Sequence, residues 1–154
     1  MTGGEDPVSV VTDDAAWDLL SSVTLGRLVT SFGGKLEIFP VNFVTQKSLK
    51  HKSADHDRSL LFRTAEGTKL FTTVMNDSVL FEADDHTTAE GWSVIVRGTA
   101  KVLTTAEEIH EADRAQLMPW VATAKLRYVR ITPEELSARR FRFGPEPQDG
   151  SVPG

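Results

Sequence analysis

The segment from Trp92 to Leu103 constrains the fold most, because its apolar and polar side chains alternate with the period of a β-strand. One face of such a strand would carry Val94, Val96, Gly98, Ala100 and Val102, and the other Ser93, Arg97, Thr99 and Lys101. The pattern predicts a long strand that is buried on one side. Shorter runs of strand composition lie at Leu25–Phe32, Leu36–Thr45, Ser59–Phe62, Val79–Ala83, Leu126–Ile131 and Leu136–Phe143.

Three short segments have helical features. The first runs from Asp13 to about Ser22, with Thr12 as the expected N-cap. Its apolar face consists of Trp17, Leu20 and Val23. The other two run from Gly67 to Met75 and from Ala106 to Gln116. Because strands dominate the chain, the pattern favours a mainly β fold, a small β-barrel with short helices.

A hairpin is predicted in the first third of the chain. Gly33-Gly34, a pair typical of tight turns, separates the first two strand-like runs. Across this hairpin, Arg27 is expected to pair with Glu37. Pro40 lies inside the second run and predicts an edge position or a bulge there, because proline has no N–H to donate.

The remaining connections and the chain ends are polar. Residues Gln46 to Arg58 are expected to form a long loop, and Thr132-Pro133-Glu134 a turn between the last two strands. Gly and Pro are frequent at both ends of the chain. The sequence therefore predicts a disordered tail over residues 1–11, one domain over 12–143 and a second disordered tail over 144–154.

Composition excludes several classes of function. The net charge is −5 and the pI about 5.3, which argues against nucleic acid as the main partner, because binding a phosphate backbone requires a concentrated basic surface. The chain has no cysteine, so disulfides, iron–sulfur clusters and cysteine-ligated zinc are excluded, and a cytoplasmic location fits. No apolar run is long enough to cross a membrane, and we expect no membrane partner.

The segment Arg63–Lys69 carries the strongest chemical signal, because it joins an apolar strand to the start of a helix. Backbone N–H groups at a helix start are unpaired and attract anions. Arg63 and Lys69 add two cations, and the hydroxyls of Thr64 and Thr68 can donate further hydrogen bonds. The spacing also suits an ordinary surface turn in which Lys69 is solvated and Arg63 pairs with Glu66, and spacing alone favours that turn.

Six segments in order resemble one protein family. They are Leu25-Gly26-Arg27-Leu28, Phe39-Pro40-Val41-Asn42-Phe43, Phe62-Arg63-Thr64 to Lys69-Leu70, Val79-Leu80-Phe81-Glu82, Gly91-Trp92-Ser93-Val94 and Arg139-Arg140. Taken together, from about Asp13 to Phe143, the chain resembles the pyridoxamine 5′-phosphate oxidase-like, flavin-binding split-barrel family. The resemblance implies a six-stranded split β-barrel that forms a homodimer, with two sites for flavin mononucleotide (FMN) at the subunit interface.

The resemblance also implies which residues bind the cofactor. Arg63, Thr64 and Lys69, within the segment that also holds Gly67 and Thr68, would contact the FMN phosphate and ribityl chain. The strand Pro40-Val41-Asn42 would run beside the isoalloxazine ring. Trp92 and Ser93 would approach the cofactor from the facing subunit, and Arg139 or Arg140 would lie near the ring or the substrate.

Each of these assignments has a plain alternative. Trp92 is equally well explained as a cap on the core. Arg139 and Arg140 are consecutive in a strand, so at most one of them faces the site. A metal site is not expected, because the four histidines, His51, His56, His86 and His110, lack the spacing of metal ligands.

The preferred function is an FMN-dependent oxidoreductase that reduces or oxidises a small organic molecule, with the chemistry carried by the flavin and no catalytic side chain. One alternative is a reductase of the same fold that uses the deazaflavin coenzyme. The other is a non-catalytic protein that stores, senses or sequesters flavin or haem. The expected partners are a second copy of the chain and a small redox substrate.

Overall fold

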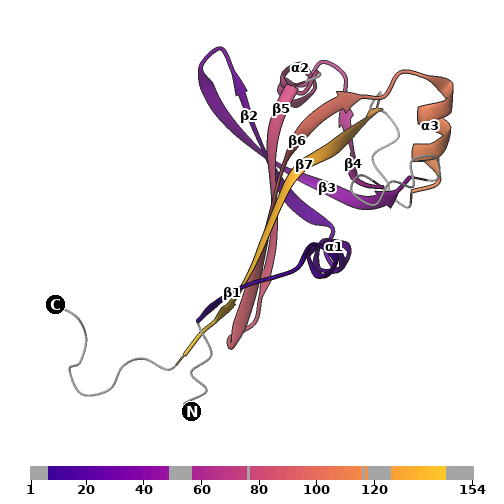
Figure 1. Ribbon diagram of the computed structural model, residues 1–154. Helices are drawn as coiled ribbons and strands as arrows, with labels where there is room; N and C mark the ends of the chain where they lie inside the picture. The colour runs from indigo at the N-terminus through magenta and orange to yellow at the C-terminus, as the bar shows by residue number, and fades with distance from the viewer. Residues whose placement is uncertain (1–6, 49–56, 76, 116, 118–125, 145–154) are drawn as a thin grey trace.

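The described part of the protein is built from long antiparallel strands and three short helices (Figure 1). The computed structural model describes residues 7–48, 57–75, 77–115, 117 and 126–144. Its elements, in chain order, are β1 (Val8–Val10), α1 (Asp13–Ser21), β2 (Leu25–Phe32), β3 (Lys35–Lys47), β4 (Arg58–Ala65), α2 (Lys69–Thr73), β5 (Asp77–His86), β6 (Glu90–Val102), α3 (Ala106–Asp113) and β7 (Leu126–Arg142).

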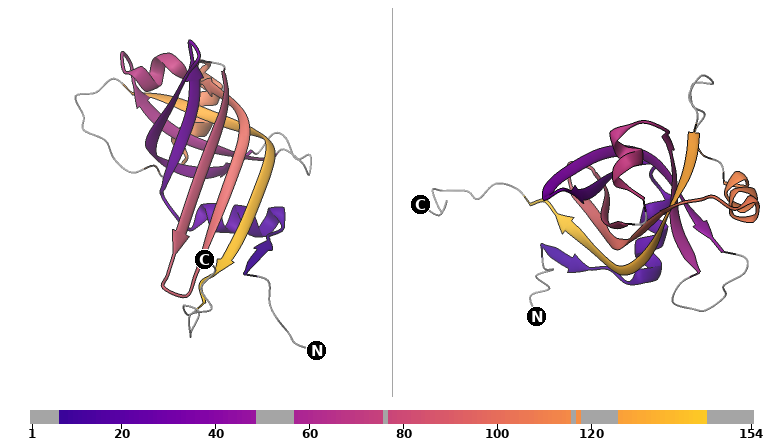
Figure 2. Two further views of the ribbon diagram at one scale, coloured as in Figure 1. Left: turned by 90° about the vertical axis from the view of Figure 1, so that its left-hand side faces the viewer. Right: turned by 90° about the horizontal axis from the view of Figure 1, so that it is seen from above.

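Six of the strands close into a barrel. In the described residues, the sheet order is β1-β7-β4-β3-β2-β5-β6, and a further pairing between β6 and β7 joins the two ends. Closure is possible because β7 is long enough to pair with two neighbours. Its first residues, from Leu126 to Ile131, pair with β4, and those from Val129 to Arg142 pair with β6. The predicted six-stranded barrel is therefore confirmed, and Figure 2 shows its ring of strands from above.

β7 corrects the prediction of two C-terminal strands separated by a turn. Thr132-Pro133-Glu134 is part of one continuous strand, and the register with β6 shifts by one residue at this point. Pro133 lies opposite Gly98 and Glu135 opposite Arg97, so Glu134 is the extra residue of a β-bulge. The turn-like composition was misleading because a bulge also accepts a proline.

Two helices and one loop have different ends from those that the sequence predicted. α2 and α3 are shorter than predicted, ending in C-caps at Val74 and Arg114. The expected loop from Gln46 to Arg58 is shorter at both ends, because Gln46 and Lys47 pair with Ser59 and Arg58 and so extend β3 and β4. Residues 49–56 lie outside the described residues.

The first residues also differ from expectation. Val8–Val10, within the stretch expected to be a disordered tail, form β1 and pair with residues 139–141 of β7. Residues 1–6 and 145–154 lie outside the described residues. The hairpin of β2 and β3 is as predicted, with both turn glycines at positive φ. Pro40 lies beyond the part of β3 that pairs with β4, which is the edge position that the sequence allowed.

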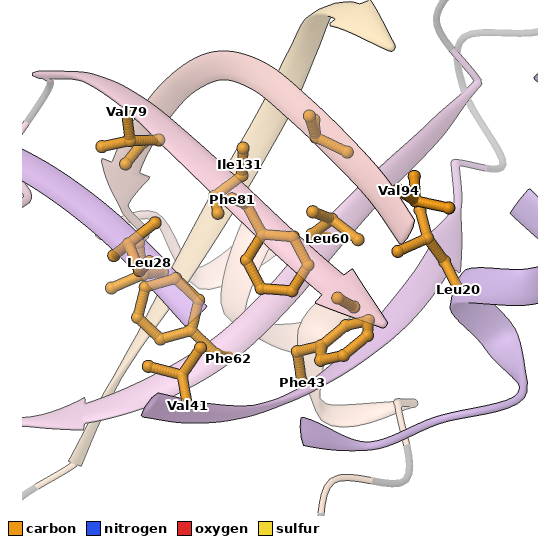
Figure 3. Close-up of a cluster of buried hydrophobic side chains, with 14 of the residues drawn as sticks. Leu20, Leu28, Val41, Phe43, Leu60, Phe62, Val79, Phe81, Val94 and Ile131 are labelled. Atoms are coloured by element: carbon orange, nitrogen blue, oxygen red, sulfur yellow. The ribbon is translucent and has the colours of Figure 1, made fainter. Parts of the chain in front are cut away.

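The barrel interior is filled by side chains from every wall. β6 contributes the alternating residues Val94, Val96, Ala100 and Val102, as predicted, and α1 contributes Ala16, Trp17 and Leu20. Figure 3 shows this cluster, in which the rings of Phe43 and Phe81 meet edge to face at 4.8 Å. Burying one such large side chain stabilises the fold by roughly 1.5–3 kcal/mol. The interior is therefore packed and holds the strand ends rigidly.

α3 packs outside the barrel on a second, smaller cluster. Leu61, Leu103 and Ala112 are buried there, with Ile109 and Leu117 packed against them. The apolar stripe of this helix thus serves packing. Among the described residues, no helix has both the length and the apolar character needed to span a bilayer.

Candidate functional site

The turn between β4 and α2 is fixed by backbone geometry and by a capping threonine. Gly67 adopts a left-handed conformation with φ of 81°, which favours glycine. Thr68 is the N-cap of α2: its hydroxyl accepts a hydrogen bond from Phe71 N at 3.2 Å and donates one to Ala65 O at 2.7 Å. Residues 65–69 are thus held as a rigid loop at one end of the barrel.

Thr64 supports this turn from inside the barrel. Its side chain is 2% exposed, and its hydroxyl lies 3.2 Å from that of Thr68. Because Thr68 already donates its proton to Ala65, Thr64 is the donor in this pair. The structure therefore joins Thr64, Gly67 and Thr68 in one small network.

The two predicted cations lie on either side of the network. Arg63 precedes Thr64 on β4 and so points to the opposite face, where it lies across from Tyr128 on β7 with its Nε atom buried. Lys69 is 64% exposed, and its Nζ forms an ion pair with Glu37 on the β2–β3 hairpin at 2.5 Å. The segment Arg63–Lys69 therefore presents cations on both sides of one turn.

A third cation at this turn could not be found from the sequence. Arg127 of β7 lies directly opposite Thr64, and its Nη1 donates to Glu66 Oε1 at 2.8 Å. The pairing of β4 with β7 brings these residues together from positions 61 apart in the chain. Only the strand register could have identified Arg127. We call Arg63, Thr64, Gly67, Thr68, Lys69 and Arg127 the basic turn.

The predicted ring-binding strand lies in the middle of β3. Pro40 and Asn42 are exposed on the outer face of the barrel, whereas Val41 is buried in the core. Asn42 lies opposite Leu25 and Pro40 opposite Arg27 in a regular register, with no bulge between β2 and β3. This strand therefore offers two side chains, Pro40 and Asn42, to a ligand outside the barrel.

The remaining predicted residues meet at the β5–β6 hairpin. Trp92 lies opposite Arg140, and Ser93 opposite Arg139. Trp92 is half-buried and packs against the core, and with Arg140, Asp85 and His86 it lines a cavity of about 190 Å³. Trp92 thus serves packing and lines this cavity as well. Both arginines are exposed.

Beside this hairpin, Arg27 has different partners from the one that the sequence predicted. It does not pair with Glu37, which lies opposite Thr30; instead, its Nη2 contacts Glu82 Oε1 at 2.6 Å and Asp84 Oδ1 at 2.7 Å on β5. The prediction was wrong because the nearer neighbour of Arg27 comes from the other side of β2. Ser93 adds a hydrogen bond to Glu82 at 3.4 Å.

The pKa values of the two carboxyl groups in this cluster, Glu82 and Asp84, are shifted in opposite directions. Burial raises the pKa of Glu82, and a hydrogen bond to Asp84 raises it further. The same hydrogen bond, followed by Arg27, lowers the pKa of Asp84. A proton that enters the cluster therefore resides on Glu82, while Asp84 stays ionised.

Comparison of the chain with known protein families identifies the family to which it belongs. The family model described as Pyridoxamine 5′-phosphate oxidase matches residues 12–140. The chain belongs to the pyridoxamine 5′-phosphate oxidase family.

Similar proteins come from species of Mycobacterium and Corynebacterium. A solved structure, named as the FAD binding protein from Mycobacterium smegmatis, is 49% identical, with a TM-score of 0.77 over 88% of this chain and 100% of that one. A conserved protein of unknown function from Corynebacterium diphtheriae is 38% identical, with a TM-score of 0.75 over 88% and 99%. The uncharacterized protein Rv3129 of Mycobacterium tuberculosis is 61% identical over 90 residues, which make up 58% of this chain and 82% of that protein.

In this member of the pyridoxamine 5′-phosphate oxidase family, the predicted site residues outside β3 form two separate groups. Figure 1 shows α2 near the tip of the β2–β3 hairpin, at the top of the view, and the β5–β6 hairpin at the bottom, beside the C-terminal end of β7. The basic turn belongs to the first end, and Trp92, Ser93, Arg139 and Arg140 belong to the second. A single chain of this family member does not bring the two groups together.

In the part of the chain that the structure describes, no three His, Asp or Glu side chains gather in a way that could hold a metal ion. His86 is exposed at the end of β5, and His110 is exposed on α3. His51 and His56 lie outside the described residues.

Proposed function

We propose that this protein binds a flavin and acts as a flavin-dependent oxidoreductase on a small organic molecule. The observation that carries the proposal is the basic turn, which gathers cations and hydroxyls at one end of the barrel in a chain of the pyridoxamine 5′-phosphate oxidase family. The relative from Mycobacterium smegmatis, named as an FAD binding protein and 49% identical, supports a flavin as the ligand.

The residues present fit a phosphate group. Arg63, Lys69 and Arg127 outnumber the carboxylates Glu37 and Glu66 at the turn, which leaves an excess of positive charge. Lys69 is exposed and Glu37 half-buried in their ion pair, and ion pairs near the surface contribute only about 0–1 kcal/mol. Lys69 can therefore exchange Glu37 for a phosphate oxygen at small cost. α2 is one short helix, so we assign the binding to side chains and turn amides rather than to a helix dipole.

The same chemistry is compatible with more than one flavin. FMN carries one phosphate ester and matches the sequence prediction, whereas FAD carries a diphosphate and matches the name of the relative. Both present phosphate oxygens that the fork of Arg63 can bind in a bidentate manner. We propose FMN as the ligand and treat FAD as the competing outcome of a direct titration.

We further propose that a second copy of the chain completes the site. The basic turn and the residues of the β5–β6 hairpin lie at opposite ends of one barrel, so Trp92, Ser93 and one of Arg139 and Arg140 would reach the flavin from a facing subunit. A surface suited to a partner is available. On the outer face of the sheet, Ile38, Val29 and Leu80 form a row across β3, β2 and β5.

Exposed apolar residues also lie beside this row. Pro40 and Ile95 lie at the ends of the adjacent row across the sheet, on either side of the Arg27–Glu82 pair. Leu36, which is 78% exposed, continues the apolar surface along β3. Contiguous exposed apolar residues of this kind are typical of protein interfaces. This outer face therefore supports the homodimer.

Within such a site the role of the protein is to bind the flavin and to orient it. A bound flavin supplies hydride or single-electron transfer. Arg63, Lys69 and Arg127 hold its phosphate end and lower the free energy of negative charge nearby. Pro40 and Asn42 line the outer strand on which the ring would rest. We assign no side chain as a general acid or base.

A double variant tests the phosphate assignment. Arg63→Ala with Lys69→Ala removes two charge-assisted contacts, each worth about 1.5–3 kcal/mol, so FMN should bind about 10²–10⁴-fold more weakly. The measurement is quenching of flavin fluorescence on titration with protein that has been freed of ligand. Lys47→Ala with Arg114→Ala, which removes two exposed cations that belong neither to the basic turn nor to the outer apolar face, is the matched control. Equal affinity of the double variant and the parent would sink the assignment.

The alternatives differ in spectrum and turnover. Tighter binding of the deazaflavin coenzyme than of FMN or FAD, with substrate reduction, would favour the deazaflavin reductase. A protein that binds flavin or haem and shows no turnover with any reductant would favour a storage or sensing role. Parallel titrations with FMN, FAD, the deazaflavin coenzyme and haem therefore decide among them.

A further inference from the structure

A groove outside both groups of predicted residues lies where α1, β3 and α3 meet. It has a volume of about 490 Å³, within the range of small-molecule sites. We call it the α1–α3 groove and define it by its lining residues, which are Ser21, Val23, Thr24, Phe43, Val44, Thr45, Gln46, Lys47, Arg114 and Ala115. It occupies the space between the C-terminal ends of the two helices and the last residues of β3.

The lining of the α1–α3 groove has a definite chemistry. Lys47 and Arg114 supply two cations, and none of the described residues that line the groove is a carboxylate, although the whole chain carries a net charge of −5. Three hydroxyls provide hydrogen-bonding groups, and Val23, Val44 and Ala115 provide an apolar wall. A site with an apolar wall and convergent cations selects a molecule that has an apolar body and an anionic group.

Hydrogen bonds hold the walls in place. Gln46 donates from Nε2 to Glu111 O of α3 at 2.8 Å, and its Oε1 accepts from Arg130 Nη2 of β7 at 2.6 Å. On the other side, the hydroxyls of Ser21 and Thr45 meet at 2.8 Å and tie α1 to β3. Both helices are therefore fixed to the same strand, and the groove between them is preformed.

The cations are available to a ligand. Lys47 Nζ lies 3.6 Å from Asp57 Oδ2, a long contact, and the Lys47 side chain is mostly exposed. Exposed pairs of this kind are weak, so a ligand anion can compete with Asp57. Arg114 is also exposed, at the end of α3, on the opposite wall of the groove from α1.

The groove continues the strand to which we assigned the flavin ring. Pro40 and Asn42 precede the groove residues Phe43 to Lys47 on β3, and strand residues are spaced about 3.3 Å apart. The groove residues of β3 therefore lie between about 3 and 17 Å from Asn42 along the strand.

We propose that the α1–α3 groove binds a small organic anion with an apolar ring or chain, and that this molecule is the substrate of the oxidoreductase. The link to catalysis rests on the proposed function, whereas binding of the anion does not.

Two matched probes test the groove. 1-Anilinonaphthalene-8-sulfonate has an apolar ring system and one anionic group, and N-phenyl-1-naphthylamine is its neutral counterpart. Replacing Lys47 and Arg114 by methionine removes both charges and keeps apolar bulk. Fluorescence titration should show at least a tenfold loss of affinity for the sulfonate and little change for the neutral probe. Lys35→Met with Arg97→Met is the control and should bind both probes like the parent.

A variant that fills the α1–α3 groove tests whether the probes bind there. Thr24 is exposed at the rim, so Thr24→Trp should leave the fold intact, as checked by thermal unfolding, and should abolish binding of both probes in the groove. Sulfonate binding that survives either Thr24→Trp or the double methionine variant would overturn the proposal, as would a parent protein that does not bind the sulfonate.

A parallel flavin titration separates this proposal from the proposed function. The double methionine variant should retain the flavin affinity of the parent, because neither residue belongs to the basic turn. If the parent binds no flavin and the sulfonate still depends on Lys47 and Arg114, the proposed function fails and the groove stands as an anion site. If flavin binds and the sulfonate is insensitive to both variants, the groove fails alone.

Discussion

At the residue scale, α3 begins with a reciprocal cap. Glu108 N donates to Thr105 Oγ1 at 3.1 Å, and Thr105 Oγ1 donates to Glu108 Oε1 at 2.7 Å. Lys101 of β6 adds an ion pair to Glu108 at 3.3 Å. The Thr105 hydrogen bond, followed by Lys101, lowers the pKa of Glu108 below its ordinary value of 4.5. Glu108 therefore couples the start of α3 to the barrel and makes that coupling depend on pH.

Replacing Glu108 by glutamine should destabilise the protein at neutral pH and not in acid. Because the pKa of Glu108 is lower in the folded state, its contribution is present above pH 4.5 and is lost as the pH falls through the folded pKa. We expect a loss of about 0.5–1 kcal/mol at pH 7. The difference should shrink as the pH is lowered below 4.5, as measured by urea unfolding at pH 7 and at a series of acidic pH values. Glu90→Gln, at an exposed position on β6, is the control; a difference that persists in acid would contradict the assignment.

Individual contacts were the hardest features to predict. The capping residue Thr12 and the turn glycines follow from local rules, and the structure has them where the sequence predicted. The predicted partner of Arg27 was wrong, because its actual partners, Glu82 and Asp84, come from a strand that the local pattern does not identify as its neighbour. Arg127 was missed for the same reason.

At the element scale, the bulge in β7 depends on a glycine in the partner strand. A Cβ atom on Gly98 would lie 2.2 Å from Thr132 O, closer than atoms can approach. The bulge presses the backbone of β7 against β6 at this position, and glycine leaves room for it. Gly98 was predicted only as a member of a buried face, whereas its real role depends on the strand opposite.

Gly98→Ala should therefore destabilise the barrel. The added methyl group must displace the backbone of β7 at Thr132, which we expect to cost about 1–3 kcal/mol. Chemical unfolding followed by intrinsic tryptophan fluorescence measures the effect. Ser137→Ala, on the exposed face of the same strand, should change stability by less than about 0.5 kcal/mol. Equal stability of the two variants would show that the bulge can yield.

At the scale of the whole molecule, the proposed dimer connects the two groups of predicted residues. The outer face that would be buried includes Ile38, which is 61% exposed, and Ile95. The Arg27–Glu82–Asp84 cluster lies on the same face, where it would supply polar contacts and orientation between subunits. Dimerisation and flavin binding should therefore be lost together.

Ile38→Asp with Ile95→Asp tests this coupling. Two unpaired charges in an apolar interface oppose its burial, so the variant should be a monomer and should bind FMN at least tenfold more weakly than the dimeric parent. Light scattering coupled to gel filtration measures the mass against 16.9 kDa for one chain. Val10→Asp, an 82% exposed position on β1, is the control. A monomeric parent that binds flavin tightly would contradict the shared site.

The sequence by itself determined the local features of this protein. The alternation in β6, the helix caps and the turn glycines depend on neighbouring residues, so the positions of most strands, the buried face of β6 and the barrel class could be predicted. The tertiary structure decided the rest. Closure of β6 on β7 selects the neighbours of each strand, and with them the place of Arg127, the partners of Arg27 and the α1–α3 groove. Cross-strand contacts depend on a register set by the whole barrel, and no short stretch of sequence encodes it.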